Sequence, residues 1–345
     1  MSRSTEVAGI DLGTNTTRIY VEGRGLVAQE PSLVALSGGR IVAIGHQALD
    51  MLGRAPASVS VTRPVQGGVI AHLGAAQAML RNLLRRCCGR RWLRRPIACI
   101  SVAHAATAVE RSAVLHAAKA ARVGQVIAVP APVAAAHGAG LELATVAGQF
   151  IIDIGAGKTE AAVISQGRIA AGGFVRIGGR DMDMAISRQI RRSYNLEIGE
   201  RTAEGLKIAI GSAYPLPSET SASAKGRDAV SGLPRSIEIS SDEVREALAE
   251  SVATIAECAQ SVLCAAPPEL AADIAENGVT LIGGGALLRG LDRLIQAHTD
   301  VPVHLAHDPL QCIAVGAGRY LDLARKLSAG APAVDADPGS APPDQ

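Results

Sequence analysis

Aromatic side chains are nearly absent from this sequence, at 2% of 345 residues, and charged residues are sparse at 19%. The interior therefore has to be built from Ala, Val, Ile and Leu instead of large rings. Hydrophobic residues make up 48% of the chain, which excludes intrinsic disorder for most of it. A length of about twice a typical domain favours two domains or one large body with two lobes.

Signals for secretion and membrane insertion are also missing. Met1–Ile10 contains no apolar segment of the kind found in signal peptides. The longest uncharged run, Val123–Leu141, contains two prolines and three glycines, so we do not expect it to form a spanning helix. The six cysteines include no CxxC pair and no zinc-type spacing, which is typical of reduced thiols. We therefore expect a soluble, intracellular, globular protein.

One stretch is strongly basic, although the formal net charge of the whole chain is only +2. Residues 81–95 contain seven arginines and no acid, which leaves a charge of −5 on the rest of the protein. A local positive patch on a mildly acidic body favours one anionic surface as a partner over general affinity for nucleic acid. These arginines are Arg81, Arg85, Arg86, Arg90, Arg91, Arg94 and Arg95.

Short β-type runs alternate with helical stretches along the chain, which predicts an α/β fold of sheets covered by helices. Helices are expected near Ala75–Arg86 and Asp242–Leu263. Strands are expected at Val7–Leu12, Thr17–Val21, Leu33–Leu36, Ile97–Val102, Val126–Val129, Phe150–Ile154, Ala161–Ile164 and Val279–Ile282.

Glycine pairs and polar segments mark the expected turns and loops. Turns are predicted at Ser37–Gly39, Gly67–Gly68 and Gly172–Gly173. Pro215–Pro234 is rich in Ser, Pro and charge and is interpreted as an irregular loop or a small subdomain. The last segment, Ala329–Gln345, has no apolar period and is interpreted as a disordered tail.

The most informative feature is an internal echo. Gly9–Thr17 and Ile152–Thr159 each end an apolar run with Asp, a hydrophobic residue and Gly, followed by a small polar turn and a second β-type run. The two aspartates, Asp11 and Asp153, are 142 residues apart. Two such copies predict a duplicated strand–turn–strand unit, one in each half.

This echo suits a polyphosphate ligand. A turn of Gly and Thr presents several backbone N–H groups to phosphate oxygens, and a carboxylate at the preceding strand end can hold a divalent cation. A third glycine cluster within Leu281–Leu288 would let the backbone approach a flat ligand such as a purine, with a helix N-terminus nearby. Either turn alone would be read as an ordinary tight β-turn, and a triple glycine alone is weak evidence.

With these motifs the chain resembles the actin/Hsp70/sugar-kinase ATPase superfamily and, within it, the bacterial MreB/Mbl family, from Gly9 to about Leu323. The resemblance is carried by Arg63-Pro64, Gly68–Ala71, Val109–Arg111, Ala134–Ala136, Gly138–Gly140, Arg180–Asp183, Tyr194–Glu204, Ile210–Pro215, Pro267–Asp273, Gly283–Asp292 and Gly316–Gly318.

The resemblance implies an actin-like, duplicated ribonuclease-H-type fold with two lobes of two subdomains each around a nucleotide cleft. Residues 1–141 and 313–328 would form the first lobe, with a small subdomain at about 32–65 and an Arg-rich loop at 85–95. Residues 142–312 would form the second lobe, with a small subdomain at about 181–240, and residues 329–345 would be a tail.

ATP and Mg²⁺ are the implied ligands, with Asp11 and Asp153 near the metal through water. Phosphate-binding turns are implied at Gly13, Thr14, Asn15 and Thr16, and at Gly155, Ala156, Gly157 and Lys158. Further nucleotide contacts are implied for Glu204, Gly205, Leu206, Lys207, Gly283, Gly284, Gly285, Ala286 and Leu287, where Glu204 and Lys207 could instead form a surface ion pair.

The sequence departs from the family at the site of hydrolysis. The family carries a Glu that orients the attacking water where this chain has Ala131, between Pro130 and Pro132. A methyl group cannot orient water, so weak or absent hydrolysis is expected. The alternative is that another residue substitutes. Glu110 could be suggested, but the family's equivalent acid lies outside the catalytic position.

The basic stretch falls where relatives carry a membrane-inserting loop. Here Trp92-Leu93 lie between Arg90-Arg91 and Arg94-Arg95, which predicts binding to an anionic leaflet. One alternative is a solvated basic helix end with Trp92 in the core. Nucleic acid is not expected, because no aromatic platform or recognition helix accompanies the patch.

The predicted function is that of an ATP-binding, filament-forming cytoskeletal protein at the inner membrane face. Its expected partners are further copies of itself, the anionic membrane and cell-wall synthesis proteins. One alternative is a nucleotide-sensing scaffold that does not polymerise. A sugar kinase or an Hsp70-type chaperone would need insertions or a C-terminal substrate domain, so both are disfavoured.

Overall fold

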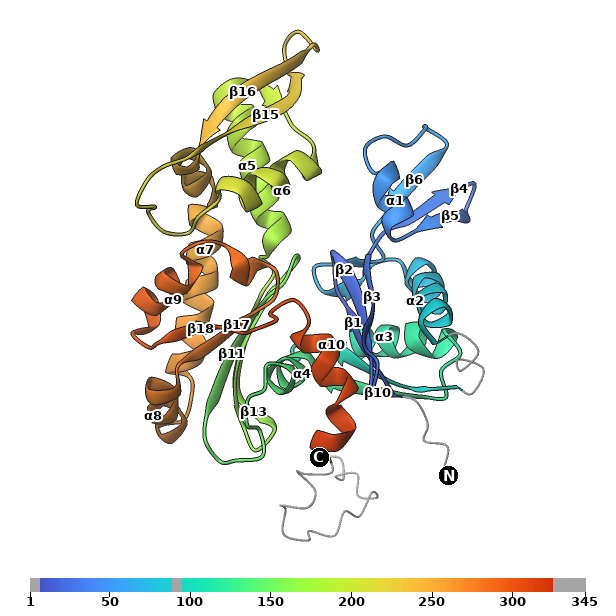
Figure 1. Cartoon of the computed structure of the whole chain (residues 1–345), viewed down its shortest axis with the longest axis vertical. Coiled ribbons are helices and arrows are strands. Elements are labelled where there is room, and N and C mark those ends of the chain that lie inside the picture. The colour runs from blue at the N-terminus through green and yellow to red at the C-terminus, as the bar shows by residue number, and fades with distance from the viewer. Residues whose placement is uncertain (1–6, 89–94, 325–345) are drawn as a thin grey trace, which may run out of the picture.

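The computed structural model describes residues 7–88 and 95–324, and these form two α/β halves that stand side by side and join at their base (Figure 1). Each half contains one five-stranded sheet and, further from the base, one three-stranded sheet. The segment with Trp92, Leu93, Arg90, Arg91 and Arg94, like the tail 329–345, lies outside the described residues.

The first large sheet has the order β10-β9-β1-β2-β3. Its strands are β1 (Val7–Leu12), β2 (Thr16–Val21), β3 (Gly25–Pro31), β9 (Ile97–Val102) and β10 (Gln125–Pro130). The first three strands are antiparallel, and β9 and β10 add in parallel to β1. Helices α2 (Leu73–Cys88) and α3 (Ala108–Ala120) pack on one face through aliphatic side chains such as Leu80 and Ile100.

The second large sheet repeats this plan in the order β13-β12-β11-β17-β18. Its strands are β11 (Gln149–Ile154), β12 (Thr159–Ser165), β13 (Arg168–Val175), β17 (Val279–Ile282) and β18 (Val303–Leu305). Again three antiparallel strands are followed by strands that add in parallel to the first. The predicted duplication is therefore confirmed, with the β1–β2 and β11–β12 turns at equivalent places.

Two helices, α4 (Ala131–Gly138) and α10 (Cys312–Gly318), lie between the two large sheets (Figure 1). They cross at glycines because there is no room for a side chain. A Cβ on Gly316 would lie 1.7 Å from the Ala134 carbonyl oxygen, and one on Gly138 would lie 1.8 Å from the Cys312 carbonyl oxygen. This contact fixes the sheets and hence the relative position of their turns.

Helix α7 (Ser241–Cys264) packs on the second sheet with α8 (Pro268–Asn277) and α9 (Leu291–Thr299) nearby. It is the one helix among the described residues that is long and apolar enough to cross a membrane, and 44% of its apolar window is buried inside the protein. Its buried face includes Leu248, Ile255 and Val262. The apolar run 123–141, by contrast, divides into β10 and α4, as expected from its prolines.

The smaller sheets extend each half. The first has the order β5-β4-β6, and the second has the order β14-β15-β16. The elements are β4 (Val34–Ser37), β5 (Arg40–Ile44), α1 (His46–Met51) and β6 (Val59–Thr62), then α5 (Gly179–Tyr194), β14 (Leu196–Glu197), α6 (Glu200–Ile210), β15 (Ser221–Asp228) and β16 (Pro234–Ser240). A short hairpin of β7 (Val65–Gln66) and β8 (Val69–Ile70) lies between the halves.

One local prediction is wrong, and one of two alternatives for a second segment is excluded. The turn expected at Gly172–Gly173 is wrong, because both glycines lie inside β13. They are there for close packing: a Cβ on Gly173 would lie 2.4 Å from Val262 Cγ2, and one on Gly172 would lie 2.7 Å from His104 Nε2. Pro215–Pro234, interpreted as an irregular loop or a small subdomain, contains all of β15 and the first residue of β16.

Candidate functional site

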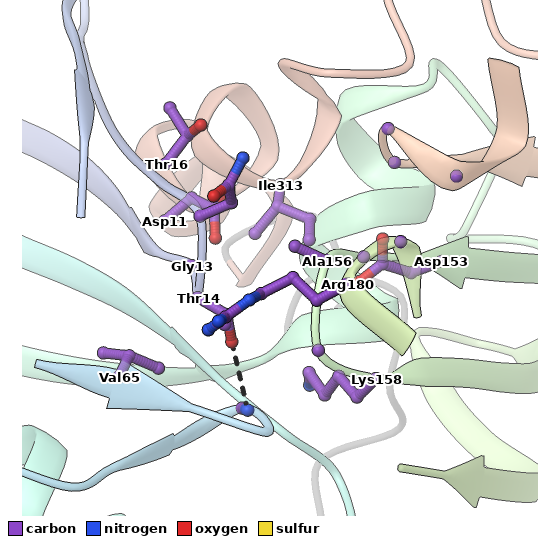
Figure 2. Close-up of a pocket in the computed structure, with 18 of the residues that line it drawn as sticks. Asp11, Gly13, Thr14, Thr16, Val65, Asp153, Ala156, Lys158, Arg180 and Ile313 are labelled. Carbon is purple, nitrogen blue, oxygen red and sulfur yellow. Dashed lines mark hydrogen bonds between the residues drawn. The ribbon is translucent and has the colours of Figure 1, made fainter. Parts of the chain in front are cut away.

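A cavity of about 460 Å³ lies between the halves, where the two equivalent turns face each other. Figure 2 shows Asp11, Gly13 and Thr14 on one side and Asp153, Ala156 and Lys158 on the other. The predicted residues that line it are Asp11, Gly13, Thr14, Asn15, Thr16, Ala131, Asp153, Gly155, Ala156, Gly157, Lys158, Glu204, Lys207, Gly283, Gly284, Gly285 and Leu287.

The first turn is held from outside the cavity. The Ser32 hydroxyl donates to the Gly13 carbonyl (2.6 Å), and Arg63 Nη1 donates to Asn15 Oδ1 (3.0 Å). The buried Thr14 hydroxyl accepts a hydrogen bond from the Gly68 N–H (3.2 Å), drawn as the dashed line in Figure 2. These contacts fix the backbone of the turn.

The second turn is closed by a hydrogen bond from the Gly155 N–H to the Lys158 carbonyl (2.9 Å). The N-terminal residues of α5 support it, since the Gly179 and Arg180 N–H groups donate to the carbonyls of Gly155 (3.0 Å) and Ala156 (2.8 Å). The two turns approach each other closely. A Cβ on Gly157 would lie 2.9 Å from the Thr14 hydroxyl oxygen, so a side chain there would push the turns apart.

Asp11 and Asp153 bring two buried carboxyl groups to the cavity. Burial raises the pKa of Asp153 to about 7, against the attraction of Lys158, and the negative charges of Glu160 and Asp11 add to the rise. Burial also raises the pKa of Asp11, although Arg18 Nη1 lies 3.8 Å from its Oδ2. Buried carboxylates that carry too little compensating charge are suited to a hard cation with oxygen ligands.

A divalent cation therefore fits this pair of carboxylates. The described residues contain no group of three His, Cys, Asp or Glu side chains that could hold a metal by themselves. A cation between Asp11 and Asp153 would complete its coordination with water or with ligand oxygens. This is the arrangement expected of Mg²⁺, which keeps several waters and is usually bound through one or two carboxylates.

Lys158 is engaged within its own half. Its ammonium donates to Glu160, whose side chain is fully buried. Glu160 also accepts hydrogen bonds from the His104 N–H and lies 3.1 Å from His104 Nδ1. Sequence reasoning missed Glu160 and His104, and the one signal for Glu160 was an acid inside an otherwise apolar strand.

Helix α6 and the glycine cluster Gly283–Gly285 also line the cavity. The alternative of a surface ion pair between Glu204 and Lys207 is not seen: Lys207 pairs with Asp183 (2.7 Å) and donates to the Gly179 carbonyl (2.7 Å). Gly283 has φ +85°, and a Cβ there would lie 2.6 Å from Asp153 Oδ1. The cluster runs into a 3₁₀ turn over Gly285–Leu287, and α9 begins only at Leu291.

Three of the predicted contact residues do not line the cavity. Leu206 and Ala286 are buried in the core of the second half, and Gly205 is exposed, with nothing within 4 Å of a Cβ added there. Only one face of helix α6 lines the cavity, so Gly205 and Leu206, which lie between Glu204 and Lys207 in the sequence, point in other directions. Sequence reasoning also missed other residues that line the cavity, including the apolar Ile208 and Arg180 of α5.

Ala131 lies at the cavity without a polar side-chain atom. Ala131 begins α4, is 4% exposed and contributes only a methyl group to the cavity. Glu110 also lines the cavity, but it is the N3 residue of a capping box. Hydrogen bonds from the Thr107 N–H (2.8 Å) and hydroxyl (3.0 Å) lower the pKa of Glu110, which makes it a poor base.

The basic stretch is described only at its ends. Arg85 and Arg86 lie in the last turn of α2, where Arg86 pairs with Glu30 (3.0 Å), and Arg95 is exposed.

Comparison with known proteins gives one consistent match. The model of the MreB/Mbl protein family matches residues 5–329. Cell shape-determining protein Mbl of Bacillus subtilis (strain 168) is 43% identical over 321 residues, covering 92% of this chain and 96% of its own length. The crystal structure of MreB 5 of Spiroplasma citri bound to AMPPNP is 35% identical with a TM-score of 0.89, covering 95% of this chain and all of that one. A MamK double helical filament matches at 22% identity, with a TM-score of 0.76 and coverage of 92% and 99%, which speaks for the fold alone.

Proposed function

Because the chain belongs to the MreB/Mbl family and has its actin-like fold, we propose that it is an ATP-binding, filament-forming cytoskeletal protein. We further propose that it works in the cytoplasm at the inner face of the cell membrane, where it organises cell-wall synthesis and cell shape. The observation that carries nucleotide binding is the pair of equivalent glycine-rich turns facing one cavity.

In this proposal the turns bind the phosphates. The backbone N–H groups of Gly13–Thr16 and Gly155–Lys158 suit phosphate oxygens, and the hydrogen bonds that hold both turns keep those groups in place before the ligand arrives. Glu204, Ile208 and the glycines from Gly283 line the wall where a ribose and a purine would lie. The related MreB 5 structure holds AMPPNP, a triphosphate analogue, which supports this assignment.

Asp11 and Asp153 are the residues proposed to hold Mg²⁺. When bound, the ion would neutralise phosphate charge and favour the ionised form of both carboxyl groups. Arg18, close to Asp11, keeps part of the negative charge balanced when no cation is present.

Hydrolysis is proposed to be weak. Binding needs phosphate turns, a cation site and a base pocket, and the residues for all three line the cavity. Cleavage also needs a water held in line with the terminal phosphate. Ala131 offers no polar atom for this task, and Glu110 is occupied with its helix cap.

Membrane association is proposed for Trp92 and Leu93 with the arginines on either side. Trp favours the bilayer interface, and each basic residue near an anionic leaflet contributes about 1 kcal/mol. Self-association into filaments is proposed from family membership.

One experiment tests nucleotide binding, filament formation and membrane association together. The protein is sedimented with and without ATP and anionic liposomes, and ATP binding is measured by calorimetry on the same preparation. We expect ATP-dependent pelleting, pelleting with the liposomes and heat of binding. No binding at millimolar ATP would refute the nucleotide proposal. Binding without filaments in electron micrographs would identify a nucleotide-sensing scaffold instead.

A further inference from the structure

Residues from both halves converge on the buried carboxylate of Glu160. The Lys158 ammonium donates to its Oε2 atom from the adjacent turn. Its Oε1 atom accepts a hydrogen bond from the His104 N–H (3.0 Å) and lies 3.1 Å from His104 Nδ1. Glu160 and Lys158 belong to the second half, whereas His104 comes from the loop between β9 and α3 in the first. Glu160 therefore accepts hydrogen bonds from both halves.

Of these three side chains, only Lys158 lines the cavity. Its aliphatic part packs on the β7–β8 turn, since a Cβ on Gly68 would lie 2.6 Å from Lys158 Cδ. Its side chain is 15% exposed. The ring of His104 packs on Gly172 of β13, away from the cavity lining.

The two oxygens of Glu160 have separate partners. Burial by itself raises the pKa of Glu160, but the charge of Lys158 and the hydrogen bonds from His104 and Lys158 outweigh this and hold the pKa below its usual value. Removing one partner from a buried charge normally carries a large penalty. If Lys158 left Oε2, His104 would still donate to Oε1, so Glu160 would keep one of its two partners and the penalty for moving Lys158 would be smaller than for a carboxylate with no other donor.

We propose that Lys158 distinguishes a nucleoside triphosphate from a diphosphate by exchanging Glu160 for an oxygen of the terminal phosphate. This inference rests on the proposed nucleotide site. With a triphosphate bound, Glu160 depends on His104 alone, and the contact between the two halves tightens. A diphosphate lacks the oxygens that attract Lys158, so the ammonium stays on Glu160 and the contact between halves is unchanged.

The first test measures the affinities for AMPPNP and ADP by calorimetry in wild type, Lys158→Thr and the double variant Lys158→Thr/Glu160→Gln. The double variant does not leave Glu160 as a buried charge without Lys158, so it guards against a loss of folding from that cause. We expect AMPPNP affinity to fall about tenfold or more, as for one lost charge-assisted hydrogen bond, with ADP affinity nearly unchanged. Lys158→Arg should restore the preference for AMPPNP. The exposed Lys225→Met variant on β15 is the matched control and should behave as wild type.

The second test follows the His104 amide, whose hydrogen bond to Glu160 crosses between the halves. In wild type its hydrogen exchange should be slower with AMPPNP than with ADP, and the difference should vanish in both Lys158→Thr variants. Equal losses of AMPPNP and ADP affinity, or equal exchange with both ligands in wild type, would overturn this inference alone. Wild type that binds neither nucleotide would refute the proposed function and this inference with it.

Discussion

Arg63 of the first half and Glu200 of the second form an ion pair that joins the two halves. Arg63 also donates to Asn15 in the first turn (3.0 Å), and Arg180 of α5 lies 3.5 Å from the same Glu200. Arg63 follows β6, the last strand of the first small sheet, and is 8% exposed. The Arg63 guanidinium thus links the first small sheet, the first turn of the cavity and the second half.

Loss of this guanidinium should affect both stability and binding. Arg63→Ala leaves Asn15 Oδ1 without its donor and Glu200 with Arg180 as its remaining ion-pair partner, so we expect the free energy of unfolding to fall by about 1–3 kcal/mol. Nucleotide affinity should fall as well, because the first turn is less restrained. Chemical denaturation and calorimetry measure the two effects, with the exposed Arg188→Ala on α5 as the matched control. A variant as stable as the control would show that the ion pair contributes nothing.

The raised pKa of Asp153 predicts that the folding stability of the protein without ligand depends on pH. In the folded state this carboxyl titrates with a pKa of about 7, above its value of 3.8 in the unfolded chain. The folded state therefore binds more protons between these values, and its stability falls as pH rises from about 4 to 7. Asp153→Asn should remove that fall, which is measured by urea denaturation at several pH values. Mg²⁺ should also reduce it in wild type but not in the variant, and parallel pH profiles for the two proteins would contradict the assignment.

Substitution of Gly205 tests whether this residue contacts the nucleotide or only forms part of helix α6. It lies within α6, is exposed, and a Cβ there would meet nothing within 4 Å. Gly205→Ala should therefore raise the free energy of unfolding by about 0.5–1 kcal/mol and leave nucleotide affinity unchanged. Gly157→Ala is the contrasting variant, since its Cβ would press on Thr14, and it should weaken binding. Thermal denaturation measures the stability of both variants, and calorimetry measures their nucleotide affinity. Weaker nucleotide binding by Gly205→Ala would show that Gly205 belongs to the binding site.

Periodicity and turn chemistry predicted much of this fold. The strands at Val7–Leu12 and Val279–Ile282 have the expected bounds, and α7 differs by one residue at each end, because apolar patterns report burial on one face. The strand β15 was not expected, since its only apolar residues are Ala222 and Ala224, and the rest of it is Ser, Lys, Gly, Arg and Asp. Its pairing with β14 and β16 comes from tertiary contacts.

The sequence also predicted some parts of the candidate site and missed others. Both turns and both aspartates could be found because the duplication repeats them in the sequence. The contact of His104 with Glu160 joins residues 56 positions apart and has no sequence signature. Leu206 and Ala286 were assigned to the ligand through neighbouring residues, but their side chains point to the core.

Membrane binding by Trp92 and Leu93 has a direct test. We expect the wild type to float with anionic liposomes, and to do so less at high salt because the arginine contribution is screened. The double variant Trp92→Ser/Leu93→Ser should lose flotation. Val230→Ser/Leu233→Ser, which changes two exposed apolar residues near the β15–β16 connection, is the matched control. Equal flotation of all three proteins would remove these two residues from the membrane contact.

The last prediction concerns Ala131, the buried residue that opens α4 at the edge of the cavity. Positioning or general-base groups commonly contribute about two to four orders of magnitude to a rate, so ATP turnover by wild type should be barely above background. Filaments would then be stabilised by ATP and disassemble slowly. Ala131→Glu places an acid where the family carries one, and phosphate release should rise in this variant with little change in nucleotide affinity.

Ala131→Gln is the matched control, because it adds similar volume without a base and should raise phosphate release less than Ala131→Glu. If the glutamate does not fit, the loss of folding would appear in thermal denaturation of both variants. Wild type that already hydrolyses ATP as fast as Ala131→Glu would show that another group holds the water. Glu110 could then be tested by Glu110→Gln, which retains part of the helix cap through the side-chain amide oxygen.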